Sequence, residues 1–274
     1  MTLHITTITP KHIISVSDRL IATSAGFREL DADLYKHIIL ITDDSIMTIC
    51  FAGFAGLVSS PNQTMDWITE VINNTSRDGF HTIEKHLSNI AITANDYIAQ
   101  FKKQRVQADA LRLAIYACGW VGTKEYGEIQ YGCVIDNCLD KWWTWAPSAR
   151  SKFTMRIKHY GDTKFEDGCY IAFLGNDRLG LKQRPQLKVL ESYAREEIPR
   201  KIFEASVNVI RTAASMSNGS IGYNCSGVRN SKGDPAIESF DDRDTTVYDV
   251  VMPNIIKSTS KISMSVTNMK GKNQ

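Results

Sequence analysis

Two pairs of helical segments, each set between segments with strand character, constrain the fold of this chain most. The first pair covers residues 64–74 and 82–103, and the second covers about residues 185–196 and 199–216. Apolar residues recur within these segments at helical spacing. An order of strands, two helices, strands, two helices and strands is typical of an α+β protein.

The strands around these helices form mostly antiparallel hairpins. Residues 3–9 and 12–23 meet at a tight turn, and residues 36–42 and 45–52 meet at an acidic turn. Short turns of this kind join antiparallel neighbours. Two antiparallel sheets packed face to face, with one helix pair on each outer side, would use every element. We therefore predict a four-layer α-β-β-α sandwich.

The second half of the chain is predicted to add further strands and a polar end. We expect one domain over residues 1–253 and a polar, basic tail over residues 254–274, and the segment 229–245 is predicted to be a loop. Strands are also expected at residues 111–118, 128–135, 153–159, 170–174, 221–228 and 246–252.

Composition excludes several classes of protein. The formal net charge is +2, which gives no electrostatic argument for a nucleic-acid or membrane partner. The longest nearly apolar run, residues 46–58, is too short to span a bilayer. No basic segment followed by an apolar core stands at the N-terminus, so no secretory signal is expected. The six cysteines are scattered, which favours free buried thiols in a reducing cytoplasm over a zinc site.

Thr2 is the candidate nucleophile. If Met1 is removed, Thr2 carries a hydroxyl and a free α-amino group on the same residue. A hydroxyl needs a base to take its proton, and an α-amino group, with a pKa of about 8, keeps a neutral fraction at neutral pH. The pair can cleave an amide.

Three further residues complete the predicted catalytic set. Asp18 closes the strand that pairs with the one starting at Thr2, so the two should lie side by side. Lys36 opens the third strand, where a cation would stabilise negative charge on oxygen and a carboxylate would orient it. Gly53 ends the fourth strand and could offer a backbone N–H to an oxyanion.

These residues resemble the pattern of proteasome β-subunits and HslV-type peptidases, which are N-terminal-nucleophile hydrolases, and of a bacterial proteasome-like group. The shared features are Thr2, Asp18 within Val16-Ser-Asp-Arg19, Lys36 before an apolar strand, and Ala52-Gly53. Lys36 lies two residues further from Thr2 than is usual in the family, which an insertion within residues 24–34 would explain.

The family's supporting residues are only partly matched. The family often has Ser after the glycine at position 175, where this chain has Asn176, and no Asp-x-x-Ser pattern is present near residues 213–217. Asn176 and Ser217 are therefore secondary candidates for the site.

The resemblance implies a threonine-type amide hydrolase, acting on peptides or proteins in the cytoplasm. It implies a ring-like homo-oligomer with a possible separate ATPase partner, and no cofactor or metal. Two alternatives stay open: a small-molecule amidase on the same fold, and a non-catalytic assembly or binding subunit.

The residues 119–167 are longer than a plain family hairpin and contain a tryptophan cluster, Trp142-Trp-Thr-Trp145. The cluster either lines a substrate groove or a subunit contact, or belongs to a loop folded over the core.

Overall fold

The structure is a computed structural model of the whole chain. It describes residues 2–22, 29–31, 35–57, 59–60, 63–122, 129–140, 145–146, 148–159, 168–175, 180–217, 219–232, 234–241 and 254–260.

Most strands belong to two sheets. The first has five strands in the order β10-β1-β2-β11-β12, and all its pairs are antiparallel. The second has six strands in the order β13-β5-β6-β7-β8-β9. A small separate pair joins β3 (Ile21–Ala22) to β4 (Glu29–Asp31). The five-stranded sheet consists of β1 (Leu3–Ile8), β2 (His12–Asp18), β10 (Tyr170–Gly175), β11 (Cys225–Ser231) and β12 (Asp234–Asp241). The six-stranded sheet consists of β5 (His37–Thr42), β6 (Ser45–Gly53), β7 (Leu113–Val121), β8 (Ile129–Asp136), β9 (Thr154–His159) and β13 (Asn254–Ser258).

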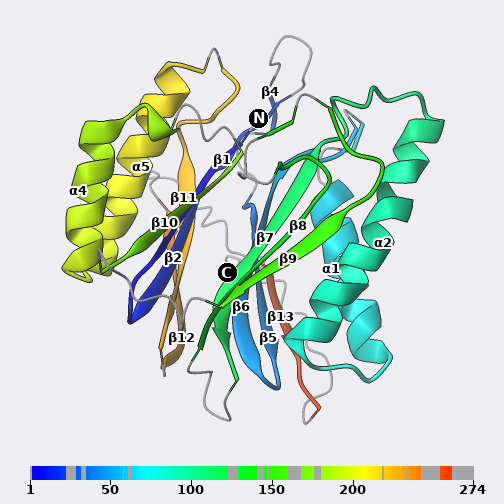
Figure 1. The fold of residues 1–274 in the computed structure, drawn as a ribbon, viewed down its shortest axis with the longest axis horizontal. Helices are drawn as coiled ribbons and strands as arrows, with labels where there is room; N and C mark the ends of the chain where they lie inside the picture. The colour runs from blue at the N-terminus through cyan, green and yellow to red at the C-terminus, as the bar shows by residue number, and fades with distance from the viewer. Residues whose placement is uncertain are drawn as a thin grey trace, which may run out of the picture.

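Each sheet carries one helix pair. Helices α1 (Gln63–Arg77) and α2 (Ile83–Lys103) share an apolar core with β5 to β8. Helices α4 (Arg184–Arg195) and α5 (Pro199–Ser215) share another core with β1 and β2. Figure 1 shows the two pairs on opposite sides, with both sheets between them. The predicted α+β class is confirmed, and the arrangement is consistent with a sandwich.

The two sheets face each other across a layer that is only partly apolar. Ile8, Ile13 and Leu174 from one sheet pack with residues of β6, β7 and β8 from the other. Buried polar contacts also cross the gap: Tyr35 donates to the carbonyl of Gly227 at 2.7 Å, and Asn230 donates to the hydroxyl of Thr48 at 2.8 Å. These bonds fix the position of one sheet against the other, because a buried polar group left unpaired is costly.

Three expectations about the strands were wrong. The six-stranded sheet is mixed, because β13 pairs in parallel with β5. The described part of the expected loop at 229–245 is mostly strand, since residues 229–231 belong to β11 and residues 234–241 form β12, which pairs with β11. The first five residues of the expected tail form β13, while residues 261–274 and the expected strand at 246–252 lie outside the described residues.

A buried serine anchors the end of β13. The Ser258 hydroxyl lies 2.7 Å from that of Ser76, 3.0 Å from Nδ1 of His81 and 2.9 Å from Nε2 of His86. The polar composition of this segment predicted a tail. In the structure, the contacts of Ser258 with α1, α2 and the connection between them hold the segment in place.

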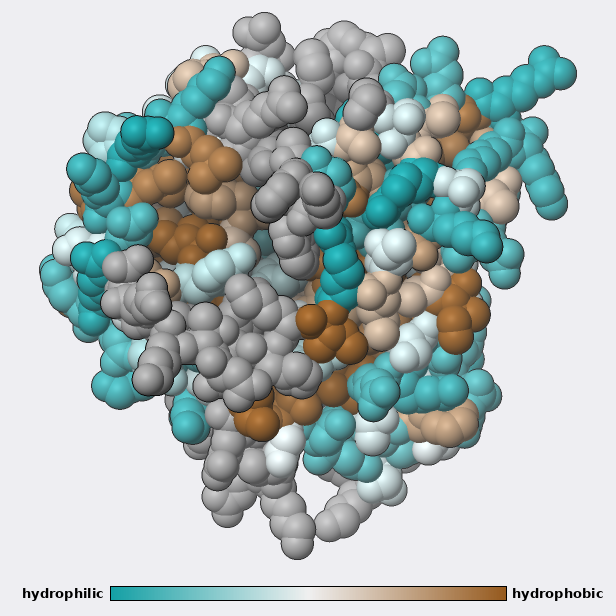
Figure 2. Space-filling view, viewed as in Figure 1, coloured by the Kyte–Doolittle hydropathy of each residue, from teal (hydrophilic) through white to brown (hydrophobic). Residues whose placement is uncertain are grey.

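An apolar hollow lies on the surface near α4 and β10. Figure 2 shows apolar side chains gathered on the side of the molecule where α4 and β10 lie. A hollow there is lined by Cys169, Ile171, Phe173, Leu181, Leu187 and Glu191. In the described part of the chain, no helix combines the length and apolarity needed to cross a membrane.

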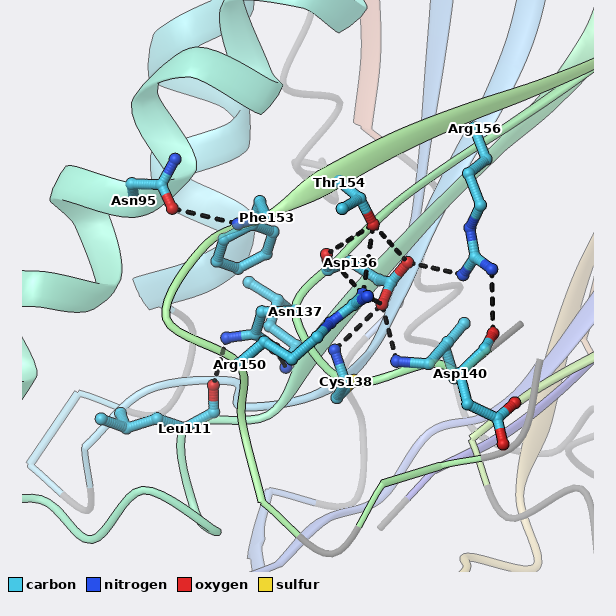
Figure 3. Close-up of polar contacts among 12 residues, drawn as sticks. Asn95, Leu111, Asp136, Asn137, Cys138, Asp140, Arg150, Phe153, Thr154 and Arg156 are labelled. Carbon is cyan, nitrogen blue, oxygen red and sulfur yellow. Dashed lines mark hydrogen bonds and ion pairs between the residues drawn. The ribbon is translucent and has the colours of Figure 1, made fainter. Parts of the chain in front are cut away.

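A buried carboxylate organises the chain after β8. Asp136 is fully buried, and its side chain accepts hydrogen bonds from the backbone N–H groups of Cys138 and Leu139 at 2.9 and 2.6 Å. It also pairs with Arg150 at 2.6 Å and Arg156 at 2.7 Å (Figure 3). The segment that leaves β8 is therefore tied to the segment that enters β9.

We predict that Asp136→Asn lowers the free energy of unfolding by about 2 kcal/mol or more, because two guanidinium groups lose a buried anion. The partly exposed arginines keep the loss below that of a fully buried pair. The matched control is Glu204→Gln, which breaks the exposed pair with Arg200 and should cost no more than about 0.5 kcal/mol. Equal losses in urea unfolding of the two variants would contradict this assignment.

Candidate active site

Three predicted site residues meet through one ammonium group. Nζ of Lys36 lies 2.8 Å from Oγ1 of Thr2 and 2.8 Å from Oδ1 of Asp18. A third hydrogen bond runs to the carbonyl oxygen of Leu20 at 2.6 Å. An ammonium group has three N–H donors, so each has an acceptor here. Lys36 therefore acts on Thr2 as a hydrogen-bond donor and a positive charge.

The carboxylate of Asp18 fixes the ammonium and also the backbone around it. Its Oδ2 accepts from the N–H of Leu3 at 2.7 Å, and its Oδ1 accepts from the N–H of Leu20 at 3.0 Å. The Asp18 side chain is fully buried, and that of Lys36 is 1% exposed. A buried ion pair persists only with good geometry and additional hydrogen bonds, and both are present.

Strand register explains why these residues meet. In the β1–β2 pair His4 lies opposite Ser17, which places Leu3 opposite Asp18 and Thr2 just beyond the pair. Lys36 directly precedes β5 of the other sheet, so its side chain joins the two sheets. Thr2 is 8% exposed.

Gly53 has a special backbone but is not hydrogen-bonded to the other three residues. Its φ of 101° is a left-handed value that favours glycine. Phe54 N–H donates to the carbonyl of Arg112 at 2.7 Å, so the neighbouring pair, Gly53 and Leu113, is a non-hydrogen-bonded one. The Gly53 N–H thus points away from β7 and toward the side of β5. The pairing of β5 with β6 begins at His37 and Cys50, so β5 does not extend as far as Gly53.

A second glycine lies directly against Thr2. Gly175 ends β10 opposite Leu3, with φ of 99°, and a Cβ at this position would overlap the carbonyl oxygen of Thr2. The same Cβ would lie 3.4 Å from the side chain of Ala52. Ala52, the residue before Gly53, therefore lies close to the backbone of Thr2.

The two secondary candidates are not brought to this site. Asn176 lies outside the described residues. Ser217 donates to the carbonyl of Ala214 at 2.9 Å and accepts from the N–H of Ile221 at 3.1 Å. Its hydroxyl therefore stabilises the turn after α5.

Two buried histidines near the ammonium are not among the predicted site residues. His4 follows Thr2 by two positions, and His37 directly follows Lys36; their ring centroids are 5.1 Å apart. His4 Nε2 also lies 3.1 Å from Sγ of Cys50. Strand alternation could have found His4, because it places His4 on the same face of β1 as Thr2.

Both imidazoles are neutral at neutral pH. Burial, aided by the Lys36 charge, lowers the pKa of His37 to about 3. Burial, His37 and Lys36 lower the pKa of His4 well below its usual value. Such weak bases are poor candidates for the proton acceptor of Thr2. Within the described ranges, no group of His, Cys, Asp or Glu side chains is arranged to hold a metal ion.

Comparison with known proteins gives a likeness of fold. No protein-family model matches the chain, and no curated protein matches its sequence. Anbu (ancestral beta-subunit) from Yersinia bercovieri is similar with a TM-score of 0.56 and 9% identity, over 90% of this chain and 89% of that one. Anbu from Hyphomicrobium sp. strain MC1 is similar with a TM-score of 0.51 and 11% identity, over 89% of each chain. A Gly-1 mutant of the latter gives a TM-score of 0.50 and 9% identity, over 88% of this chain and 87% of that chain.

These comparisons correct the resemblance drawn from the motifs. The assignment to proteasome β-subunits and HslV-type peptidases was wrong, because the similar structures are Anbu proteins, a proteasome-like but distinct group. The fold of this chain is proteasome-related. At 9–11% identity these likenesses show the fold alone and identify no family.

We predict that His37→Phe flattens the acid dependence of stability. The folded protein leaves His37 neutral down to about pH 3, whereas the unfolded chain binds a proton below about pH 6.5. The free energy of unfolding should therefore fall as pH falls from about 6.5 to 3, and the variant should lose this contribution. Urea unfolding from pH 7 to 4 measures it. An NMR titration midpoint of His37 above pH 6 would contradict the prediction.

Proposed function

We propose that this protein is a threonine-type amide hydrolase, with Thr2 as its N-terminal nucleophile after loss of Met1. The observation that carries the proposal is the buried ammonium of Lys36, within hydrogen-bond distance of both the Thr2 hydroxyl and the Asp18 carboxylate. The arrangement places a fixed positive charge where negative charge would develop on the attacking oxygen. The proteasome-related fold supports the same chemistry.

In the proposed reaction the α-amino group of Thr2 is the base. Lys36 donates to Oγ1 of Thr2, and the nearby histidines are weak bases. Oγ1 would bond to the substrate carbonyl carbon while its proton moves to the amine. The carbonyl oxygen would become an oxyanion that the Gly53 N–H stabilises.

The second half of the reaction returns the enzyme to its starting state. The C–N bond breaks as the amine passes its proton to the leaving nitrogen, which leaves an ester on Thr2. Water then attacks the ester carbonyl, with the amine again as base, and releases the acid product. Lys36 and Asp18 form no covalent bond to the substrate and transfer no proton.

The substrate we propose is a peptide or protein, and the working form we propose is a self-assembled, ring-like homo-oligomer in the cytoplasm. A possible ATPase partner would be a separate protein. The Anbu likeness supports a proteasome-related α-β-β-α architecture of the N-terminal-nucleophile type, and it is consistent with self-assembly.

We predict that the protein purified from its own host lacks Met1 and gains the mass of a peptide epoxyketone at Thr2. Such a reagent needs both the hydroxyl and the free amine of the residue it modifies. Thr2→Ala should form no adduct and should lose about 10³-fold or more in peptide hydrolysis. The control Thr212→Ala, on the solvent side of α5, should behave as wild type. A retained Met1 with no adduct, measured by intact mass, would overturn the enzyme proposal in favour of a non-catalytic subunit.

We predict that Lys36→Met abolishes hydrolysis and lowers the free energy of unfolding by about 3 kcal/mol, because the Asp18 carboxylate is left buried without a cation. Adding Asp18→Asn removes that unpaired charge, so the double variant should regain part of the stability while it stays inactive. Recovery of activity together with stability would show that Lys36 acts only through folding. Thermal unfolding and single-turnover hydrolysis measure the two properties separately.

A further inference from the structure

An indole ring lies beside the predicted oxyanion donor. A Cβ at Gly53 would be 3.1 Å from Cη2 of Trp145, so the edge of the ring contacts the glycine backbone. A glycine at this position is needed both for its positive φ and for the space taken by Trp145 and the Arg112 backbone. Trp145 is partly exposed.

The buried carboxylate of Asp136 helps to position Trp145 through the residues after β8. Asp136 binds the N–H groups of Cys138 and Leu139, and Leu139 pairs with Trp145 in an antiparallel bridge. Ala146, the next residue, donates from its N–H to the carbonyl of Cys138 at 2.7 Å. Figure 3 shows the Asp136 carboxylate between Cys138, Arg150 and Arg156.

Arg112 holds the indole from the side of β7. Its Nη1 donates to the carbonyl of Ala146 at 3.0 Å, and its Nε donates to the carbonyl of Asp109 at 2.7 Å. Its guanidinium carbon lies 5.9 Å from the centre of the Trp145 ring, within cation–π range. The ring is therefore held by contacts with its own chain.

The same ring borders the surroundings of Thr2. Trp145 packs on the apolar cluster between the sheets, which includes Ala52 and Leu174. Ala52 precedes Gly53, and Leu174 precedes Gly175, whose backbone touches Thr2. The indole and Thr2 are thus both close to the ends of β6 and β10.

We propose that Trp145 is the residue that determines specificity for a bulky apolar or aromatic side chain next to the scissile carbonyl. The inference rests on the proposed function, because it takes the Gly53 N–H as the donor to that carbonyl. Because the indole contacts the same glycine, we expect the substrate residue that supplies the carbonyl to neighbour the ring. A flat apolar ring, preordered by Arg112 and Asp136, favours a side chain that buries apolar surface against it.

The test compares two peptide amides with a fluorogenic leaving group, one with Phe and one with Asp at the residue before the scissile bond. Wild-type protein should prefer the Phe peptide in kcat/KM. Trp145→Ala should lose about tenfold or more on the Phe peptide and little on the Asp peptide. Trp145→Phe keeps an aromatic ring and should retain most of the preference.

Trp67→Phe is the matched control, because Trp67 stacks on Tyr97 at 4.4 Å in the helix layer. It should leave the Phe-to-Asp preference unchanged. If Trp145→Ala does not fold, the comparison rests on Trp145→Phe and Trp145→Leu, for which Leu should lower the preference more than Phe does.

Two outcomes would overturn the inference, and they can be told apart. Active wild-type protein whose preference is unchanged in every folded Trp145 variant would overturn the role of Trp145 and leave the proposed function intact. Wild-type protein that neither cleaves the peptides nor reacts with the epoxyketone would overturn the proposed function and this inference with it.

Discussion

A single buried ion pair holds the candidate site together. The ammonium of Lys36 comes from the strand end of one sheet, and the carboxylate of Asp18 comes from the other. Because neither charge is accessible to water, each depends on the other and on the hydrogen bonds to Thr2, Leu3 and Leu20. The geometry around Thr2 therefore depends on how the two sheets pack against each other.

The two histidines near this ion pair are neutral, so Lys36 is not accompanied by a further cation from either of them. His4 and His37 lie within the same buried layer, and burial together with the Lys36 charge keeps both imidazoles neutral. Each would otherwise add a second cation beside Lys36. This leaves an α-amino group on Thr2 as the base that the proposed chemistry needs.

A second buried carboxylate performs a similar task further along the chain. Asp136 binds two arginines and two backbone N–H groups. These contacts hold the residues after β8 that pair with Trp145, whose ring contacts Gly53. The sequence placed three tryptophans in an unusually long connection and left their role open. Whether Trp145 faces a site or the core depends on the pairing of Leu139 with Trp145, which no local pattern reveals.

The local elements and the strand ends could be predicted from the amino-acid sequence. Apolar periodicity and turn residues predicted both helix pairs and the first hairpin, and the spacing of Thr2, Asp18 and Lys36 predicted residues that the structure joins by hydrogen bonds. These patterns missed the strand Asn254–Ser258, whose last residue is held by Ser76, His81 and His86, all far away in the sequence. The parallel pairing of that strand, the neutral state of His4 and His37, and the contact of Trp145 with Gly53 arise only when the chain is folded. Each of these depends on burial and on partners far apart in the chain, which periodicity does not encode.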